Sequence, residues 1–431
     1  MNQNAQSLIY SYLNADQSVF PKELVGQLHA NDISAQDIEF WLRKGRPVKA
    51  PSDFVPGKLS REIPLTCDHV NYDTHFFLYL PRNYQPEKPS PLLVIGHGGN
   101  GNMSKAYARQ IAFLSIQDWI SIADQFGFIL VAPMTEKGWG NMGYAIVFSL
   151  ISKIKRWYSI DPDRVYITGH SMGGHLSWRS ALALGDRFGA VSPMSGGYDY
   201  VARDMMPLLW NVPGYATFGS QEPYQIDDYN RKMRSWIKKH GYNWIIQEKP
   251  GGHEIFFDEL PRVAGFFLSH PRNLYPAKVW GQGGRKQAVD QPDQGWQRIH
   301  YWNPFKPIPK GCFHWLRIFD RPDLREGEKQ KIVGEIRKEE NAIHLISSQV
   351  RKVRIYLHPH MINFSQPVRI MVNGETLYEE KPHPDPAKML YTIREFDDWG
   401  RIFYTWIDLE IHTDRQPEIW GTGPEPGDFF A

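Results

Sequence analysis

Short apolar runs at regular spacing are the main pattern in the middle of the chain. Between residues 59 and 270, runs rich in β-branched and aromatic residues alternate with segments long enough for helices. The first two runs are separated only by a short turn and are expected to form a hairpin. The pattern predicts an eight-stranded, mostly parallel sheet with helices on its faces. The expected strands are Ile63–Cys67, His75–Leu80, Leu92–Ile95, Phe128–Val131, Val165–Thr168, Ala190–Pro193, Tyr215–Phe218 and Trp244–Gln247.

The C-terminal part of the chain shows strand patterning of another kind. Apolar and polar residues alternate over 353–357 and again over 368–372, and Asn373-Gly374 is a strong signal for a two-residue hairpin turn. A further strand is expected at 403–411. Alternation of this kind is typical of sheets with one buried face, so residues 296–431 are predicted to form a β-sandwich-like domain.

The segments that flank the predicted sheet are punctuated by proline and glycine. Residues 1–58 contain helix-like pieces, one of them capped by Ser34, before several prolines interrupt the pattern. We interpret this segment as a helical N-terminal extension that packs against the adjoining 59–270 domain. Residues 271–295 are polar and rich in glycine and proline, and are expected to be a linker.

Composition narrows the range of functions. A chain of 431 residues is too long for one average domain, and a formal net charge of +2 gives no reason to expect nucleic acid or an anionic membrane as a partner. No apolar run is long enough to span a bilayer, and no signal peptide is visible at the start. The expected location is the cytoplasm, or outside the cell if the sequence is a mature form. Cys67 and Cys312 fall in different predicted domains, so a disulfide is not expected.

The segment Gly169–Gly174, Gly-His-Ser-Met-Gly-Gly, carries the strongest chemical signal. It lies between a predicted strand and a predicted helix, where a G-x-S-x-G turn forms a nucleophile elbow. Glycine two residues before and two residues after Ser171 relieves the crowding of this sharp turn. The alternative is an ordinary helix start with Ser171 as N-cap. The flanking strand and helix favour the elbow.

A serine nucleophile needs a base and a carboxylate that orients the base. Where a sheet carries a nucleophile elbow, the acid and then the histidine follow the serine along the chain. His253, on the loop after the last predicted strand, is the candidate base. Glu222, after the preceding strand, is the candidate acid. The alternative acids are Asp227, Asp228 and Asp199.

The loop after the third strand, Gly96–Asn102, is expected to complete an oxyanion hole. Its glycines allow backbone N–H groups to turn towards Ser171. Such a mechanism requires neither a metal nor an organic cofactor, and the pair His358 and His360 lacks a third ligand nearby. The expected oxyanion donors are Met172, Gly98 and Gly99. The expected pocket residues are His97, His170 and Trp139, although core packing is the more ordinary role for Trp139.

Residues 160–174, continued by 186–191 and 195–197, resemble α/β-hydrolases of the esterase D, feruloyl esterase and polyhydroxybutyrate depolymerase-like group. The lead from Phe77–Pro81 into His97–Gly99 is similar to the same group. The resemblance spans residues 64–268 and implies hydrolysis of carboxylic esters through an acyl-enzyme. Two departures are Glu222, where aspartate is usual, and the missing signal peptide of the secreted members. The C-terminal part is similar to a β-module appended to some bacterial hydrolases, and its role is not implied.

Three functions remain open from the sequence. The leading one is a serine esterase that acts on a small-molecule or saccharide-linked ester. Prolyl oligopeptidase-like peptidases share similar motifs, so peptide cleavage is an alternative. The third is a non-catalytic protein, in which a hydrolase scaffold serves carbohydrate binding or another interaction. Retention of Ser171, His253 and a carboxylate argues against it, because a retired site has no need of all three. The oligomeric state and the acyl and alcohol specificity are not predicted.

Overall fold

The protein divides into two compact units, and each is described here by itself. The computed structural model describes residues 3–14, 22–45, 48, 50–67, 72–197, 200–284, 311–319, 321, 323–325 and 328–415. Of the described residues, 50–67, 72–197 and 200–273 make up the central unit. The terminal unit comprises residues 1–48, 274–285 and 306–418, so it is built from both ends of the chain.

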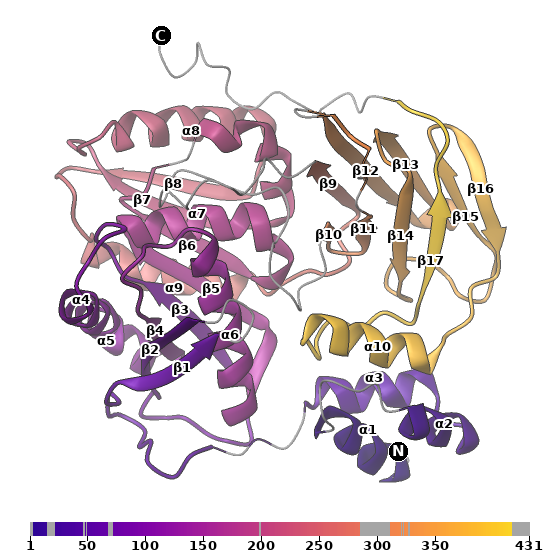
Figure 1. The fold of residues 1–431 in the computed structure, drawn as a ribbon, viewed down its shortest axis with the longest axis horizontal. Helices are drawn as coiled ribbons and strands as arrows, with labels where there is room; N and C mark the ends of the chain where they lie inside the picture. Colours follow the sequence, from indigo (N-terminus) through magenta and orange to yellow (C-terminus); the bar gives the residue numbers. More distant parts are fainter. Residues whose placement is uncertain are drawn as a thin grey trace. The chain divides into compact units, whose positions relative to one another are not determined.

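An eight-stranded sheet forms the middle of the central unit (Figure 1). Its order is β1-β2-β4-β3-β5-β6-β7-β8; β1 and β2 pair antiparallel, β2 pairs antiparallel with β4, and the remaining pairs are parallel. This confirms the predicted α/β-hydrolase sheet with an antiparallel start. The strands are β1 Ile63–Cys67, β2 Tyr72–Tyr79, β3 Ser90–Gly96, β4 Ile129–Pro133, β5 Ile160–His170, β6 Ala190–Met194, β7 Gly214–Gly219 and β8 Trp244–Lys249.

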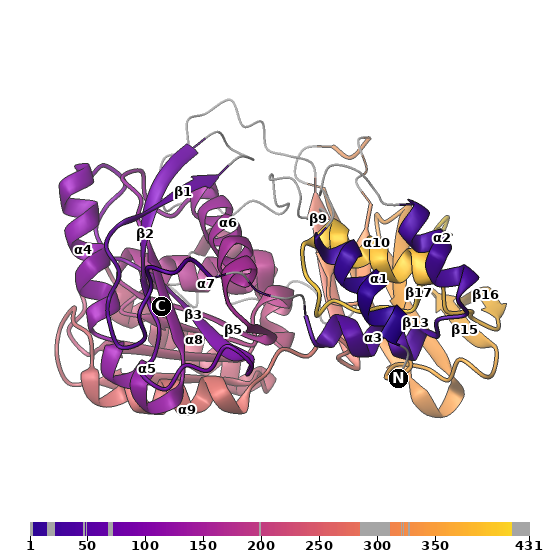
Figure 2. The same cartoon turned by 90° about the horizontal axis from the view of Figure 1, so that it is seen from below.

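Helices cover both faces of this sheet. Consecutive residues of a strand point to opposite sides, so neighbouring residues pack against different helices. Ile95 belongs to a buried cluster that includes side chains of α4, α5 and α9. The next residue, Gly96, faces Leu176 of α7. Figure 2 shows the helices around the sheet from a second direction. The helices of this unit are α4 Lys105–Gln117, α5 Ile120–Phe126, α6 Asn141–Trp157, α7 Met172–Leu184, η2 Gly185–Arg187, η3 Tyr200–Asn211, α8 Ile226–His240, η4 Phe257–Glu259 and α9 Leu260–Ser269.

The terminal unit contains two further sheets, of order β10-β11-β14-β17 and β16-β15-β13-β12-β9. The ring of Trp315, beside the first sheet, packs against Gly334 of the second, where a Cβ would meet the ring at 2.6 Å. The predicted hairpin turn is confirmed, with positive φ at Asn373 and Gly374 between β15 and β16. The strands are β9 Lys278–Gly284, β10 Cys312–Phe313, β11 Leu316–Ile318, β12 Lys329–Arg337, β13 Ala342–Ser348, β14 Lys352–Leu357, β15 Val368–Val372, β16 Glu375–Glu380 and β17 Thr405–Glu410.

The N-terminal helices belong to the terminal unit, where their apolar partner is a helix from the C-terminal part of the chain. α1 (Gln3–Asn14), α2 (Lys22–Ala30) and α3 (Ala35–Arg43) share one buried apolar cluster with α10 (Pro386–Phe396). The Tyr12 hydroxyl donates to the Leu390 carbonyl at 2.7 Å. Their apolar faces are thus buried against a helix that lies more than 300 residues further along the chain. The predicted Ser34 cap of α3 is present.

The predicted linker over 271–295 also contains a strand. β9 pairs with β12 along its whole length, and residues 285–295 lie outside the described part. Its glycines gave it the composition of a linker. At Gly281 the reason is packing, since a Cβ there would meet the Phe313 ring at 2.7 Å and Ile332 at 3.0 Å. A small η6 turn, Lys338–Glu340, joins β12 to β13.

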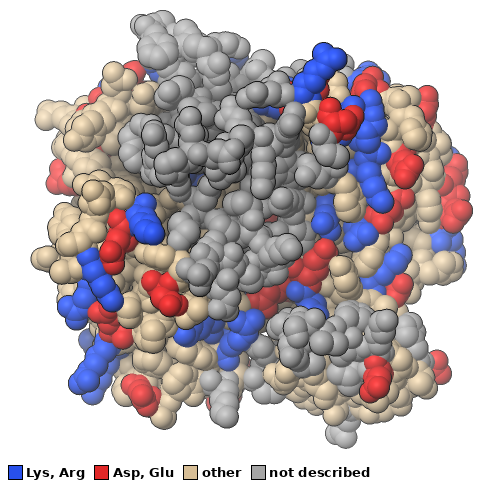
Figure 3. Space-filling view, in the orientation of Figure 1, with Lys and Arg blue, Asp and Glu red and all other residues tan. Residues whose placement is uncertain are grey.

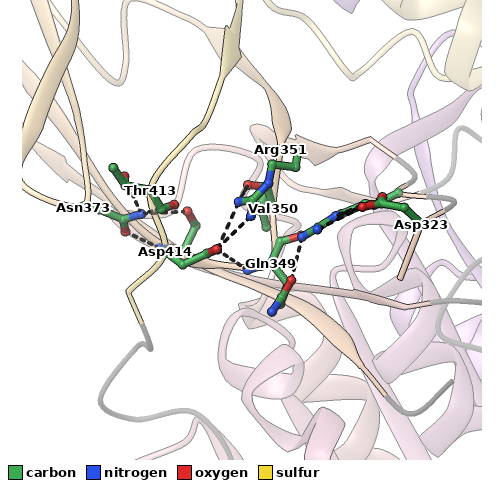
Figure 4. Close-up of polar contacts among 9 residues, drawn as sticks. Asp323, Gln349, Val350, Arg351, Asn373, Thr413 and Asp414 are labelled. Atoms are coloured by element: carbon green, nitrogen blue, oxygen red, sulfur yellow. Dashed lines mark hydrogen bonds and ion pairs between the residues drawn. The ribbon is translucent and has the colours of Figure 1, made fainter. Parts of the chain in front are cut away.

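A polar network ties the loop between β13 and β14 to the segment after β17 (Figure 4). Asp414 accepts from the backbone N–H of Gln349 at 2.6 Å and pairs with Arg351 at 2.9 Å. Arg321 binds the Gln349 side chain at 2.6 Å and also pairs with Asp323. Asn373 donates to the Thr413 carbonyl at 2.9 Å. These contacts hold the loop between β13 and β14 against the segment that follows β17.

Charged side chains of the two signs are interspersed over the face drawn in Figure 3. This agrees with the nearly balanced composition of the chain. Among the helices that the structure describes, none combines the length and apolarity needed to cross a membrane.

Candidate active site

Ser171 occupies a strained turn between the end of β5 and the start of α7. Its φ of 59° and ψ of −116° are rarely adopted by a residue with a side chain. A Cβ on Gly169 or Gly173 would collide with the carbonyl oxygen of Gly96, at the end of the neighbouring β3. Glycine at these two positions therefore allows the strand and the helix to meet at the sharp angle that lifts the serine out of the sheet.

His253 joins Ser171 to Glu222. Its Nε2 lies 2.8 Å from the Ser171 Oγ, and its Nδ1 lies 2.5 Å from the Glu222 Oε2. An ionised carboxylate can only accept, so Nδ1 carries the proton and Nε2 is left to accept the serine hydroxyl. The three residues come from the ends of β5, β7 and β8, at the carboxyl edge where the sequence pattern predicted a site.

The Glu222 carboxylate is fully shielded from solvent, whereas 28% of the His253 side chain is exposed. Burial alone would raise the pKa of Glu222. Hydrogen bonds from His253 and from the Gly219 N–H, the latter at 3.0 Å, outweigh burial and hold that pKa below its ordinary value. Glu222 therefore stays ionised and keeps the imidazole in one tautomer.

The other carboxylates considered for this role are engaged elsewhere or not described. Asp227 pairs with Arg231 and Asp228 with Lys232, both at 2.9 Å and both one helical turn apart in α8. Asp199 lies outside the described residues.

The loop after β3 lies over the serine. A methyl group on Gly98 would be 3.5 Å from the Ser171 Cβ, and Gly99 has a φ of 112° that favours glycine. Met172 is the first residue of α7, so its N–H has no acceptor within the helix. The structure thus brings Gly98 close to Ser171, with Met172 directly after it, whereas the position of a Cβ on Gly99 would be next to Met103 and Ile111.

His97 and Trp139 do not line a pocket, which corrects the sequence-based prediction. Both side chains are almost entirely buried. The Thr135 N–H donates to the His97 Nε2 at 3.1 Å, so its Nδ1 carries the proton and donates to the Gly98 carbonyl at 2.7 Å. Trp139 donates to the His97 carbonyl at 2.8 Å. Burial lowers the pKa of His97 to about 4, so it stays neutral and holds the glycine loop in place.

His170 packs beside the candidate base. The ring centroids of His170 and His253 are 4.8 Å apart. Burial, and to a smaller extent the neighbouring His253, lower the pKa of His170 to about 4. A neutral ring next to His253 adds no competing charge when the base takes up a proton.

The part of the chain that the structure describes contains no cluster of three or more His, Cys, Asp or Glu side chains that could hold a metal ion. His358 donates from Nε2 to Glu39 at 3.3 Å and accepts the His360 N–H at Nδ1. This histidine is therefore a hydrogen-bonded member of the terminal unit.

The sequence did not indicate two residues near the site, Thr135 and Ser195, which act through hydrogen bonds that involve backbone groups. Thr135 fixes His97, and Ser195 donates to the Glu254 carbonyl at 3.1 Å, beside the His253 loop. Ser195 also has a positive φ of 45°. No spacing rule signals such contacts. Their position directly after the ends of β4 and β6 is the one available hint.

Comparison with known proteins supplies a family for part of the chain. The family model "Esterase", described as "Putative esterase", matches residues 142–303, which include Ser171, Glu222 and His253. A "Probable feruloyl esterase C" of Aspergillus oryzae is 32% identical over 135 residues, covering 30% of this chain and 48% of the relative.

Two longer proteins also match. A "Bifunctional acetylxylan esterase/xylanase" of Neocallimastix patriciarum is 30% identical over 246 residues, covering 54% of this chain and 34% of the relative. A "Putative dipeptidyl aminopeptidase" of Schizosaccharomyces pombe is 28% identical over 185 residues, covering 37% of this chain and 22% of the relative. The chain thus spans about half the length, or less, of the curated relatives it matches.

Proposed function

We propose that this chain, whose central unit belongs to the esterase family of hydrolases, cleaves carboxylic esters through an acyl-enzyme on Ser171. One observation carries the proposal. His253 contacts both the Ser171 hydroxyl, at 2.8 Å, and the buried Glu222 carboxylate, at 2.5 Å. A strained serine, a base and an orienting carboxylate in one hydrogen-bonded row are what acyl transfer to serine requires.

In the first half of the reaction, the Ser171 Oγ attacks the ester carbonyl carbon while its proton passes to the His253 Nε2. Glu222 stabilises the imidazolium that forms, and negative charge develops on the carbonyl oxygen. In this proposal the N–H groups of Met172 and of the Gly98-Gly99 loop bind this oxyanion. Each such donor contributes about 3 kcal/mol. The C–O bond to the alcohol then breaks, and the imidazolium gives its proton to the leaving oxygen.

In the second half, water replaces the alcohol. His253 takes a proton from the water as it attacks the acyl carbonyl, and returns that proton to the Ser171 Oγ when the ester bond to the enzyme breaks. The carboxylic acid leaves and the enzyme is restored.

The substrate class we propose is an ester in which a carbohydrate carries a feruloyl or acetyl group. Its support is the printed names of two relatives, a feruloyl esterase C and a bifunctional acetylxylan esterase/xylanase. A peptidase is the second candidate, because a dipeptidyl aminopeptidase also matches part of the chain. The same triad chemistry serves both substrates, so the pocket rather than the triad would separate them.

Fluorophosphonate labelling tests the mechanism in the full-length protein. We expect covalent labelling of Ser171, and loss of both label and esterase activity in Ser171→Ala. Ser235→Ala is the matched control, since Ser235 is an exposed serine on α8 whose hydroxyl donates to the Arg231 carbonyl of the same helix. A folded wild-type protein that takes up no label would refute the serine-hydrolase proposal and favour the non-catalytic alternative.

A substrate panel then separates the esterase from the peptidase. Methyl ferulate, a feruloylated oligosaccharide, an acetylated oligosaccharide and an Xaa-Pro amide are compared by kcat/KM. Turnover of esters well above the amide is the expected result. The reverse ranking would favour the peptidase.

A further inference from the structure

Tyr224 has features that the fold does not explain. Its side chain is 86% exposed, the largest value among the exposed large hydrophobic side chains of the described residues. A tyrosine normally buries much of its ring, because the ring is the largest apolar surface it can remove from water. This side chain therefore contributes little to the stability of the central unit.

The backbone at this position also disfavours tyrosine. Tyr224 has a φ of 59° and the next residue, Gln225, a φ of 61°, so two consecutive residues with side chains occupy the left-handed region. Glycine or asparagine adopts that conformation at lower cost than a bulky residue. Neither burial nor local conformation accounts for a tyrosine here. Residues kept at such local cost cluster at functional sites.

The position of Tyr224 relates it to the candidate active site. It lies two residues after Glu222, and two residues span about 7 Å at most. Glu222 in turn contacts His253, which contacts Ser171. Tyr224 therefore lies near the carboxyl edge of the sheet, on the loop that supplies Glu222.

The neighbours of Tyr224 indicate what the ring could bind. Gln221 and Gln225 are exposed, and Asp227 and Asp228 follow in the first turn of α8. A lipid or long acyl chain would need a continuous apolar surface. A sugar ring has an apolar face of C–H groups and an edge of hydroxyls, which match an isolated aromatic face surrounded by amides and carboxylates.

We propose that Tyr224 is a stacking platform for the saccharide part of the substrate, outside the triad. It would bind the alcohol side of the ester rather than the acyl group, and so favour saccharide-linked esters over simple alkyl esters. This inference rests on the proposed function, since it names the substrate class of the same site.

Paired substrates test the platform kinetically. Wild type, Tyr224→Asn and Tyr224→Phe are compared on a feruloylated xylo-oligosaccharide and on methyl ferulate. We expect Tyr224→Asn to lower the ratio of the two kcat/KM values about fivefold, mainly through the KM of the oligosaccharide, as the loss of one aromatic contact would. Tyr224→Phe keeps the ring and should keep the ratio. Tyr107→Asn, a change of another exposed tyrosine, on α4, should leave both substrates unaffected.

A binding measurement separates this inference from the proposed chemistry. Titration of the xylo-oligosaccharide into full-length Ser171→Ala, with and without Tyr224→Asn, needs no turnover. Weaker binding on loss of the ring supports the platform even if the triad proposal fails. Unchanged binding and an unchanged substrate ratio overturn it. A Tm in Tyr224→Asn no lower than that of wild type, expected because asparagine tolerates a positive φ, shows that a damaged fold is not the cause.

Discussion

At the scale of single residues, the site depends on groups that never touch the reacting atoms. His97 is buried, holds one proton on Nδ1, and donates it to the Gly98 carbonyl at 2.7 Å. The geometry of the loop is set by a histidine whose protonation does not change over the neutral range, because its pKa is lowered to about 4.

Substitution of His97 tests this positioning role. In His97→Ala the Thr135 N–H loses its acceptor and the Gly98 carbonyl its donor, so the loop loses its fixed orientation. We expect kcat to fall by about 10- to 100-fold, with a smaller change in KM, because a well-placed oxyanion donor stabilises the transition state more than the bound substrate and a misplaced one does not. Steady-state kinetics with a small aryl ester measures the changes in kcat and in KM separately. A loss in KM alone would contradict the role.

The sequence pointed to Ser171 and His253 as a candidate nucleophile and base, and left the acid open. Order along the chain and position after strands brought out Ser171, His253 and Glu222. In the structure Glu222 contacts His253, whereas Asp227 pairs with Arg231 and Asp228 with Lys232. His97 and Trp139 were misassigned because their partners are backbone groups, and backbone groups carry no sequence signal.

At the scale of elements, α3 is held to the sheets of the terminal unit by a partly buried carboxylate. Glu39 accepts from Tyr404 at 2.8 Å and from His358 at 3.3 Å, and pairs with Arg43 at 2.7 Å. Burial would raise the pKa of Glu39. These hydrogen bonds and charges outweigh burial and lower that pKa to about 2.

The depressed pKa makes the stability of the terminal unit pH-dependent. The contribution of ionised Glu39 is fully present above its unfolded value of 4.5 and is lost as the pH falls from there towards about 2. It amounts to about 3 kcal/mol at most. We expect the Tm of Glu39→Gln to lie below that of wild type at pH 7 and to approach it at pH 3. Thermal unfolding at both pH values measures this, with the exposed Glu23→Gln as control. An equal Tm difference between Glu39→Gln and wild type at both pH values would contradict the predicted pH dependence.

Elements with a strong local pattern were predictable, and those defined by distant partners were not. The strands of the central sheet and the hairpin at Asn373-Gly374 follow from apolar runs and turn chemistry. β9 was taken for a linker because its glycines look like loop residues, whereas Gly281 is required by the ring of Phe313. The pattern of α1 to α3 indicated helices, but nothing local identified α10 as their partner.

At the scale of the whole molecule, the central unit is inserted between two segments of the terminal unit. Removal of residues 274–431 would therefore strip the N-terminal helices of α10 and expose an apolar face. We expect a chain of residues 1–273 to aggregate and one of residues 50–273 to stay in solution and take up fluorophosphonate label. Size-exclusion chromatography and labelling compare the two. Equal, monomeric behaviour of both chains would show that the helices do not depend on α10.

The contact between Tyr12 and Leu390 also has a consequence for synthesis of the protein on the ribosome. The two residues are 378 positions apart in the chain. At 5 to 20 residues per second, the first helices emerge about 20 to 75 s before their partner is made. The central unit can complete its sheet during that interval, while the apolar side of α1 stays uncovered. The N-terminal helices of a nascent chain are thus exposed to aggregation for longer than any later element. A chaperone that binds apolar helices would shield them until α10 is translated.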